Sequence, residues 1–232
     1  MRFLLVTPGL LLVLAACGGQ SSEEVAPPSD ASPLAVMLAS PQGPAVADLV
    51  SGKPSRARTE LEEALAADPD GMAALNDLGV SYAMEERFDA ARQLLEEVLA
   101  RGAPPEQQAA LINLGELYAL DGYLGAALAH LASAKAIDPT RPEPSYALAL
   151  LADARDDRTG SEAALRAAQD LDPSGSARRA LIFLYPEERQ HLDALLAEAA
   201  GDRAGAVTRW RELARGRFPT LAAAAQRHLE EF

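Results

Sequence analysis

The chain has 232 residues, of which 49% are hydrophobic and only 5% aromatic. This is enough apolar material for one elongated domain or an array of repeats. The formal net charge of −13 argues against nucleic-acid binding, because phosphate recognition needs a basic face. Ala and Leu dominate the apolar residues and favour helices over strands, so the composition predicts an all-α protein.

The charge is unevenly distributed along the chain. Residues 1–175 carry 12 basic and 26 acidic side chains, whereas residues 176–232 carry 9 basic and 8 acidic ones. The last quarter is therefore arginine-rich on an otherwise acidic molecule. Such runs are usually solvated helix faces. The single cysteine, Cys17, excludes an intramolecular disulfide.

The first residues have the pattern of an export signal. Arg2 precedes an apolar run from Phe3 to Ala16, which is too short for a comfortable transmembrane helix and ends in small residues. We therefore expect a signal peptide over residues 1–16. The following small, polar, Pro-rich stretch through residue 33 predicts a flexible tether, because it cannot bury enough apolar surface to offset ordering.

The end of this signal, Leu14-Ala15-Ala16-Cys17-Gly18, resembles the lipobox of bacterial lipoproteins. The resemblance implies that Cys17 receives a diacylglycerol, with palmitate-type chains, and becomes the first residue after cleavage. Several acyl chains on one residue give stable membrane anchoring. Gly18 after the cysteine implies sorting to the outer membrane, facing the periplasm. The alternative is an ordinary signal peptide in which Cys17 is incidental.

Dipeptides recur along the remaining chain at fixed spacing. Asp-Pro occurs at 68–69, 138–139 and 172–173, and Leu-Gly occurs at 78–79 and 114–115. A period near 34 residues with these features resembles the tetratricopeptide repeat (TPR), a helix-turn-helix unit. The resemblance implies a superhelical solenoid of the TPR type. An ordinary amphipathic bundle would not place Asp-Pro at one-period spacing.

The repeat pattern divides the chain into units of unequal quality. Residues 34–175 hold the repeats: 38–71 (partial), 72–105, 108–141 and 142–175. Residues 176–232 hold an irregular segment, a degenerate repeat at 187–220 and a C-terminal capping helix. We expect Gly52, Gly122 and Gly201 in the turns between helices, since glycine tolerates positive φ. Prolines, including Pro104 and Pro219, are expected to end second helices.

The sequence shows no catalytic or metal-binding constellation. His130, His191 and His228 are isolated in sequence, and adjacent glutamates such as Glu187 and Glu188 point apart on a helix. A lone histidine on a helix is usually a surface or half-buried residue. We therefore predict a protein that is not an enzyme and has no cofactor or metal.

In TPR proteins the first helices of successive repeats line a concave groove. Carrying those positions over gives the predicted protein-binding residues Asn76, Val80, Met84, Ile112, Glu116, Leu120, Tyr146, Leu150 and Asp153. These first helices contribute acidic spots but no Lys or Arg, so we expect a partner segment with apolar anchors and basic residues. Tyr146 is the best candidate hot spot, being large and amphipathic.

Two alternatives place this surface differently. The apolar run Leu34, Val36, Met37 and Leu38 needs burial somewhere, and could cover the groove from within the chain. A partner could instead bind the arginine-rich C-terminal helix through Arg209, Arg211, Arg215 and Arg217, if that partner is acidic.

Anchor and repeats together predict a non-catalytic scaffold or adaptor for other proteins of the bacterial envelope. The combination also resembles pilotin-like assembly factors for type IV pilus secretins, Flp-pilus lipoproteins and adaptors of peptidoglycan hydrolases. A third hypothesis is an enzyme or ligand-binding lipoprotein with its site at the degenerate C-terminal repeat.

Overall fold

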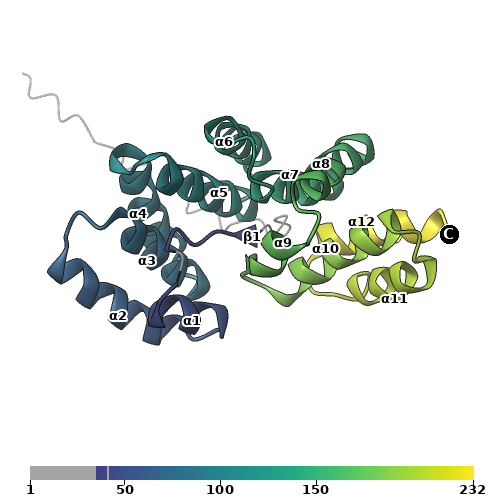
Figure 1. Cartoon of the computed structure of the whole chain (residues 1–232). Helices are drawn as coiled ribbons and strands as arrows, with labels where there is room; N and C mark the ends of the chain where they lie inside the picture. Colours follow the sequence, from purple (N-terminus) through teal and green to yellow (C-terminus); the bar gives the residue numbers. More distant parts are fainter. Residues whose placement is uncertain (1–34, 41) are drawn as a thin grey trace, which may run out of the picture.

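The computed structural model describes residues 35–40 and 42–232. The predicted signal peptide, the lipid site at Cys17 and the whole predicted tether lie outside these residues. Within them the chain forms twelve α-helices and one pair of two-residue strands. Figure 1 shows the helices stacked along an arched array, with α1–α4 at one end and α10–α12 at the other. None of the described helices is long and apolar enough to span a bilayer.

Antiparallel helical hairpins build this array. The hairpins are α1 (Pro44–Val50) with α2 (Pro54–Ala67), α3 (Met72–Met84) with α4 (Phe88–Arg101), α5 (Pro104–Leu120) with α6 (Leu124–Ile137), α7 (Glu143–Ala154) with α8 (Arg158–Leu171), and α10 (Pro186–Ala199) with α11 (Arg203–Leu213). The short α9 (Ser176–Ala180) and β2 (Ile182–Phe183) precede α10, and α12 (Pro219–Glu230) ends the array. The predicted all-α helix-turn-helix solenoid is confirmed.

Proline marks both ends of these helices. The Asp-Pro aspartates Asp68, Asp138 and Asp172 directly follow α2, α6 and α8, so each proline ends a second helix as expected. Pro104 and Pro219 differ from the expectation, because they begin α5 and α12. Proline suits the first helical turn, where its missing N–H would have had no intrahelical partner.

One turn position repeats through the array with a left-handed backbone. The predicted glycines Gly52, Gly122 and Gly201 have φ of 70°, 78° and 74°. In the α3–α4 and α7–α8 hairpins the same role falls to Glu86 (φ 58°) and Asp156 (φ 65°). A side chain at such φ is strained, since the Cβ atom crowds the backbone.

The Leu-Gly dipeptides lie where the two helices of a hairpin cross. A Cβ atom on Gly79 would stand 3.0 Å from Cγ of Leu95, and one on Gly115 would stand 3.1 Å from Cγ of Leu131. Glycine therefore lets a leucine of the second helix reach the first. Leu114, beside Gly115, is 1% exposed, which agrees with its predicted place in the core.

The chain brings together two segments that the repeat pattern did not pair. β1 (Ala35–Val36) runs antiparallel to β2, with Ala35 opposite Phe183 and Val36 opposite Ile182. Figure 1 shows β1 in the middle of the arch, between the N-terminal hairpins and α9–α10. The sequence predicted only a short helix or irregular linker for residues 176–185, and β2 lies within this segment.

The strained turn at Glu86 generates a stability prediction. Glu86→Gly should raise the free energy of unfolding by about 0.5–1 kcal/mol, because relief of the left-handed strain exceeds the entropy that glycine adds to the unfolded chain. Gly122→Ala at the equivalent turn should lower it by about 1 kcal/mol. Urea denaturation followed by circular dichroism measures both. Equal effects of the two substitutions would contradict this assignment of the turn.

Candidate interaction groove and buried histidine joint

The nine predicted groove residues lie on the first helices of three hairpins. Asn76, Val80 and Met84 belong to α3, Ile112, Glu116 and Leu120 to α5, and Tyr146, Leu150 and Asp153 to α7. Eight of them are buried and Met84 is half-buried. Residues 37–40 lie against these helices, which agrees with the alternative that the N-terminal apolar run covers the groove. The C-terminal helices, which the sequence did not predict there, also pack on this side. The role of the nine predicted groove residues in binding a partner stays a prediction.

Three polar side chains hold the main chain of the covering segment. The Met37 N–H donates to Asn113 Oδ1 at 2.5 Å, and the Met37 carbonyl accepts from Asn113 Nδ2 at 2.8 Å and from Asn76 Nδ2 at 3.0 Å. The Ala39 and Ser40 N–H groups donate to the Asp77 carboxylate at 2.7 and 3.1 Å. The three side chains thus bind mainly an extended backbone, and Asp77 also accepts a hydrogen bond from the Ser40 side chain.

The same three side chains are ordered by one another. Asn113 Nδ2 donates to Asn76 Oδ1 at 3.0 Å, and Asn76 Nδ2 donates to Asp77 Oδ1 at 3.0 Å. All three are 1% exposed or less. Burial raises the pKa of the Asp77 carboxyl, while its hydrogen bonds from Ser40, Asn76 and Ala39 act in the opposite direction. Hydrogen bonds among the three side chains hold them in place on α3 and α5.

Glu116, another predicted groove residue, faces the C-terminal half of the molecule. It forms a hydrogen bond with Glu188 of α10, and both side chains are fully buried. Burial raises the pKa of Glu188 well above its usual range, although the Tyr185 N–H donates to Glu188 Oε2 at 3.1 Å. The Glu116–Glu188 pair joins α5 to α10, and burial favours the neutral form of Glu188.

Tyr146 does not have the exposure that a hot spot requires. Its side chain is buried, and its hydroxyl donates to Asp172 Oδ2 at 3.2 Å, at the end of α8. Burial and the Asp172 carboxylate raise the pKa of Tyr146 to about 12. Tyr146→Ala should therefore lower the free energy of unfolding by about 3–5 kcal/mol, because it removes a buried aromatic side chain.

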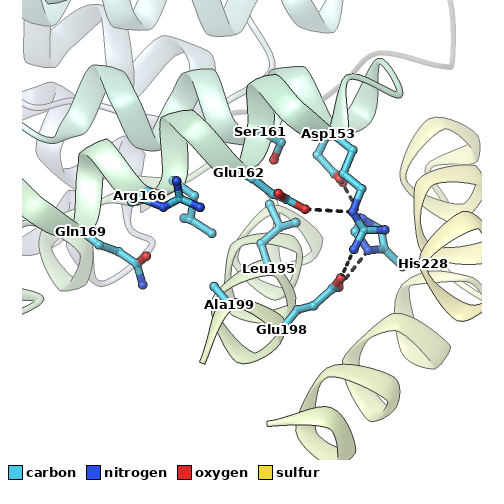
Figure 2. A pocket seen from close by; sticks show the side chains of 11 residues that line it. Asp153, Ser161, Glu162, Arg166, Gln169, Leu195, Glu198, Ala199 and His228 are labelled. Carbon is cyan, nitrogen blue, oxygen red and sulfur yellow. Dashed lines mark hydrogen bonds and ion pairs between the residues drawn. The ribbon is translucent and has the colours of Figure 1, made fainter. Parts of the chain in front are cut away.

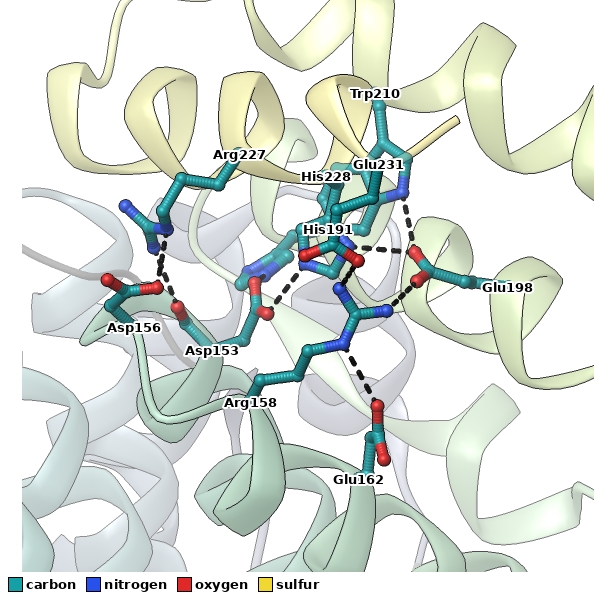
Figure 3. A network of polar contacts seen from close by, with 10 residues as sticks. All are labelled: Asp153, Asp156, Arg158, Glu162, His191, Glu198, Trp210, Arg227, His228 and Glu231. Carbon is teal, nitrogen blue, oxygen red and sulfur yellow. Dashed lines mark hydrogen bonds and ion pairs between the residues drawn. The ribbon is translucent and has the colours of Figure 1, made fainter.

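Asp153 lies in a polar joint between α7 and the C-terminal helices. Its Oδ2 is 2.6 Å from His191 Nε2 of α10, and its Oδ1 is 2.8 Å from His228 Nε2 of α12. The Asp153 carbonyl also accepts from Arg227 at 3.0 Å. Figure 3 shows these side chains converging from three helices. Two of the three histidines that are isolated in the sequence, His191 and His228, thus belong to one buried cluster.

His228 has a carboxylate at each ring nitrogen. Its Nδ1 is 2.8 Å from Glu198 Oε2, which also accepts from Trp210 Nε1 at 3.0 Å. The His228 ring stacks on the Trp210 indole with centroids 4.1 Å apart. This geometry holds a doubly protonated imidazolium between two anions and one aromatic face.

The pKa values of the joint follow from these contacts. Burial by itself would lower the pKa of His228, but the hydrogen bonds and charges of Asp153 and Glu198 outweigh it and raise the pKa to about 9. Burial would raise the pKa of Asp153, but His191 and His228 outweigh it and hold that pKa well below its usual range. Both groups are charged at neutral pH.

Arg158 extends the joint at the start of α8. Its guanidinium pairs with Glu198 at 2.7 Å and Glu162 at 3.0 Å, and it also contacts Glu231 beyond α12. A cavity of about 340 Å³ opens beside it, between α8 and α10. Figure 2 shows His228 and Glu198 at one end of this cavity and Arg166 with Gln169 at the other. The charged groups around Arg158 satisfy one another.

The buried histidines do not form a recognisable reaction centre. A general base has to reach a substrate, whereas His191 and His228 are 0% and 6% exposed. Among the described residues, no group of three or more His, Cys, Asp or Glu side chains is arranged to hold a metal ion. The geometry supports a structural joint.

An open hollow of about 870 Å³ remains beside the covered groove. α1, β2, α10 and the segment that holds Met37 contribute to its lining, and Val50 in its wall is 64% exposed. Its charged lining residues are Arg141, Glu143, Arg179, Arg189 and Asp193. The arginines come from outside the predicted first-helix positions: Arg141 precedes α7, Arg179 lies on α9 and Arg189 on α10. Its mixed charge does not favour a basic partner over an acidic one.

The histidine joint was missed by sequence reasoning, although a signal was present. His191 shares the buried stripe of α10 with Leu195 and Glu198, at i+4 and i+7, and His228 follows Leu221 by seven residues on α12. Polar residues on an otherwise apolar stripe indicate a buried network. The sequence alone does not show that His191 and His228 both contact Asp153.

The family comparison identifies the repeats. A family model of the tetratricopeptide repeat matches residues 45–104 and 85–142, which cover α1–α6. The chain therefore contains tetratricopeptide repeats. TPR domains bind other proteins or peptides and are generally non-catalytic scaffolds, so the repeats point to a protein-protein interaction scaffold. No curated protein sequence matches the chain.

Two solved structures are similar to the chain, and one of them supports a shared fold. A thermophilic TPR protein of Thermus thermophilus is 22% identical and superimposes with a TM-score of 0.56, over 80% of this chain and 95% of that one. The crystal structure of MamA is 18% identical, with a TM-score of 0.46 over 82% of this chain and 98% of that one. The likeness to the Thermus protein extends the TPR-like solenoid beyond residue 142.

The joint generates a pH prediction. The folded pKa of His228, about 9, lies above its ordinary value of 6.5, so its stabilisation is complete below about pH 6.5 and is lost as pH rises through 9. The loss is on the order of 3 kcal/mol. His228→Gln should remove most of this pH dependence between pH 6.5 and 9. Urea denaturation at a series of pH values measures it.

His130→Gln is the matched control. His130 stacks on Tyr118 of α5, far from the joint in sequence, and burial lowers its pKa. Its stabilisation is therefore lost as pH falls, opposite to His228. Glu188 also loses stabilisation as pH rises, so the difference between wild type and His228→Gln isolates the histidine. An unchanged alkaline slope in His228→Gln would contradict the charged joint.

Proposed function

We propose that this chain is a non-catalytic scaffold of the bacterial envelope, which a lipid on Cys17 anchors to the membrane. The observation that carries its binding role is the set of Asn76, Asn113 and Asp77, which holds the extended main chain of residues 37–40 on the concave face. A solenoid that satisfies an extended backbone in this way can hold a protein segment. The chain's tetratricopeptide repeats support the same role.

The anchor part of the proposal depends on the motif from Leu14 to Gly18. A lipid at Cys17 would place the repeat body next to a membrane, and Gly18 favours the outer membrane facing the periplasm. Partners would then be other envelope proteins.

A narrower role is a pilotin-like assembly factor for a type IV pilus secretin or a Flp pilus. It is supported only by the resemblance in anchor and repeats. The identity of the captured partner distinguishes it from a general adaptor. Secretin or pilus subunits would support the narrower role.

The first prediction of this proposal concerns the anchor. Cys17→Ser should leave the protein without lipid, because Cys17 is the only thiol in the chain. Incorporation of radiolabelled palmitate and fractionation of membranes measure this directly. Gly18→Ala, which keeps the thiol, should retain the label. Label that persists in Cys17→Ser would disprove the anchor.

The second prediction concerns the binding face. A photo-crosslinking amino acid at Val50, which is 64% exposed in the wall of the hollow, should form adducts with envelope proteins in cells. The matched control is Tyr123, which is 63% exposed in the turn before α6 and does not line the hollow. Adducts from Tyr123 but none from Val50 would place the interface elsewhere, for example on the surface around Arg211 and Arg215.

A further inference from the structure

Residues 37–40 are bound as a peptide would be. Five of the hydrogen bonds that Asn113, Asn76 and Asp77 make to them end on main-chain atoms, and Asp77 also accepts one from the Ser40 side chain. The apolar contact comes from the Met37 side chain, which is 7% exposed and belongs to the same core cluster as Ile112. The site therefore requires an extended backbone and one apolar side chain, and it tolerates many sequences.

The opposite wall of this site is β2. Its pairing with β1 uses main-chain atoms only. Arg189 of α10 donates to the Leu181 carbonyl at 2.7 Å, and its guanidinium lies 4.6 Å from the Phe183 ring centroid. The Tyr185 N–H is bound by Glu188. β2 is therefore held by α10 independently of residues 35–40.

We propose that β2, Asn76, Asn113 and Asp77 form a strand-binding site, which residues 35–40 fill in cis and which a partner enters by exchanging its own extended apolar segment for them. This inference rests on the proposed scaffold function and names its mode of recognition. The partner adds a strand antiparallel to β2, as in β-strand addition at an exposed sheet edge.

The site sets chemical limits on the incoming segment. The residue in the Met37 position has to offer both N–H and carbonyl to Asn113, and the residue in the Ala39 position has to offer an N–H to Asp77. Proline is therefore excluded at both positions. A medium-sized apolar side chain fits the Met37 position, and small residues fit the two positions after Leu38.

The covalent link makes residues 35–40 a strong competitor. They are joined to α1 by only three residues, and a short linker gives an effective concentration on the order of millimolar. A free peptide therefore binds weakly to the unmodified chain. Weakening the cis segment should strengthen binding in trans.

The test uses the full chain and a fluorescent peptide with the sequence of residues 34–40, followed by anisotropy. Ala39→Pro removes the N–H that Asp77 binds, so the peptide should bind this variant at least about tenfold more tightly than wild type. The matched control is Gln42→Pro, which places the same ring at an exposed position whose N–H bonds to no described residue. Asn113→Ala in the Ala39→Pro background should abolish the gain.

A second measurement needs no substitution. Excess peptide should accelerate hydrogen exchange at the amides of Met37 and Ala39 in the wild-type chain, while the amides of α3 and α5 stay protected. If the peptide binds and the hydrogen-exchange rates of these two amides do not change, the proposed displacement of residues 35–40 is wrong. Equal affinity of Ala39→Pro and Gln42→Pro for the peptide would overturn it as well.

The two proposals can fail separately. Adducts from Val50 without peptide exchange would leave the scaffold standing and refute the strand-binding site. Peptide exchange without any envelope adduct would support the site and refute the envelope role.

Discussion

Each first helix of the array presents a second apolar surface toward the concave side, and the burial of that surface governs how both ends of the chain fold. Val80, Ile112 and Leu150 on this side are fully buried. Val80 shares a core cluster with Ile182 of β2, and Ile112 and Leu150 share one with Met37 and with Leu192 of α10, so the N-terminal segment and the C-terminal elements contribute to their cover. The solenoid is closed on itself because an exposed apolar groove of this length would be unfavourable in water.

Polar contacts decide where the cover sits. Asn113 binds Met37, Glu116 meets Glu188, and Asp153 receives two histidines. Each of these groups is buried, and a buried polar group costs free energy unless it is paired. A shift of the cover by one residue would leave several of them unpaired at once. Apolar burial therefore drives the closure, and the polar pairs fix its register.

Sequence reasoning predicted the features that local chemistry determines. The Asp-Pro stops and the turn glycines follow from proline's missing N–H and glycine's tolerance of positive φ, both of which a sequence displays. It could not assign the concave residues correctly, because their burial depends on segments far away in the chain. The sequence suggested that Tyr146 is exposed, whereas its hydroxyl bonds to Asp172 in the folded chain. The sequence showed His228 without a partner, whereas Asp153 and Glu198 lie beside it in the structure.

The pairing of Ala35 with Phe183 joins positions about 150 residues apart. In an open repeat array each unit contacts only its neighbours, so units can melt one after another from the ends. Here the outer units are tied to each other across the concave side, and fraying at one end removes contacts at the other. The chain should therefore unfold more nearly as a single cooperative body than its repeats imply, and fold more slowly, because the final closure has to bring distant segments together.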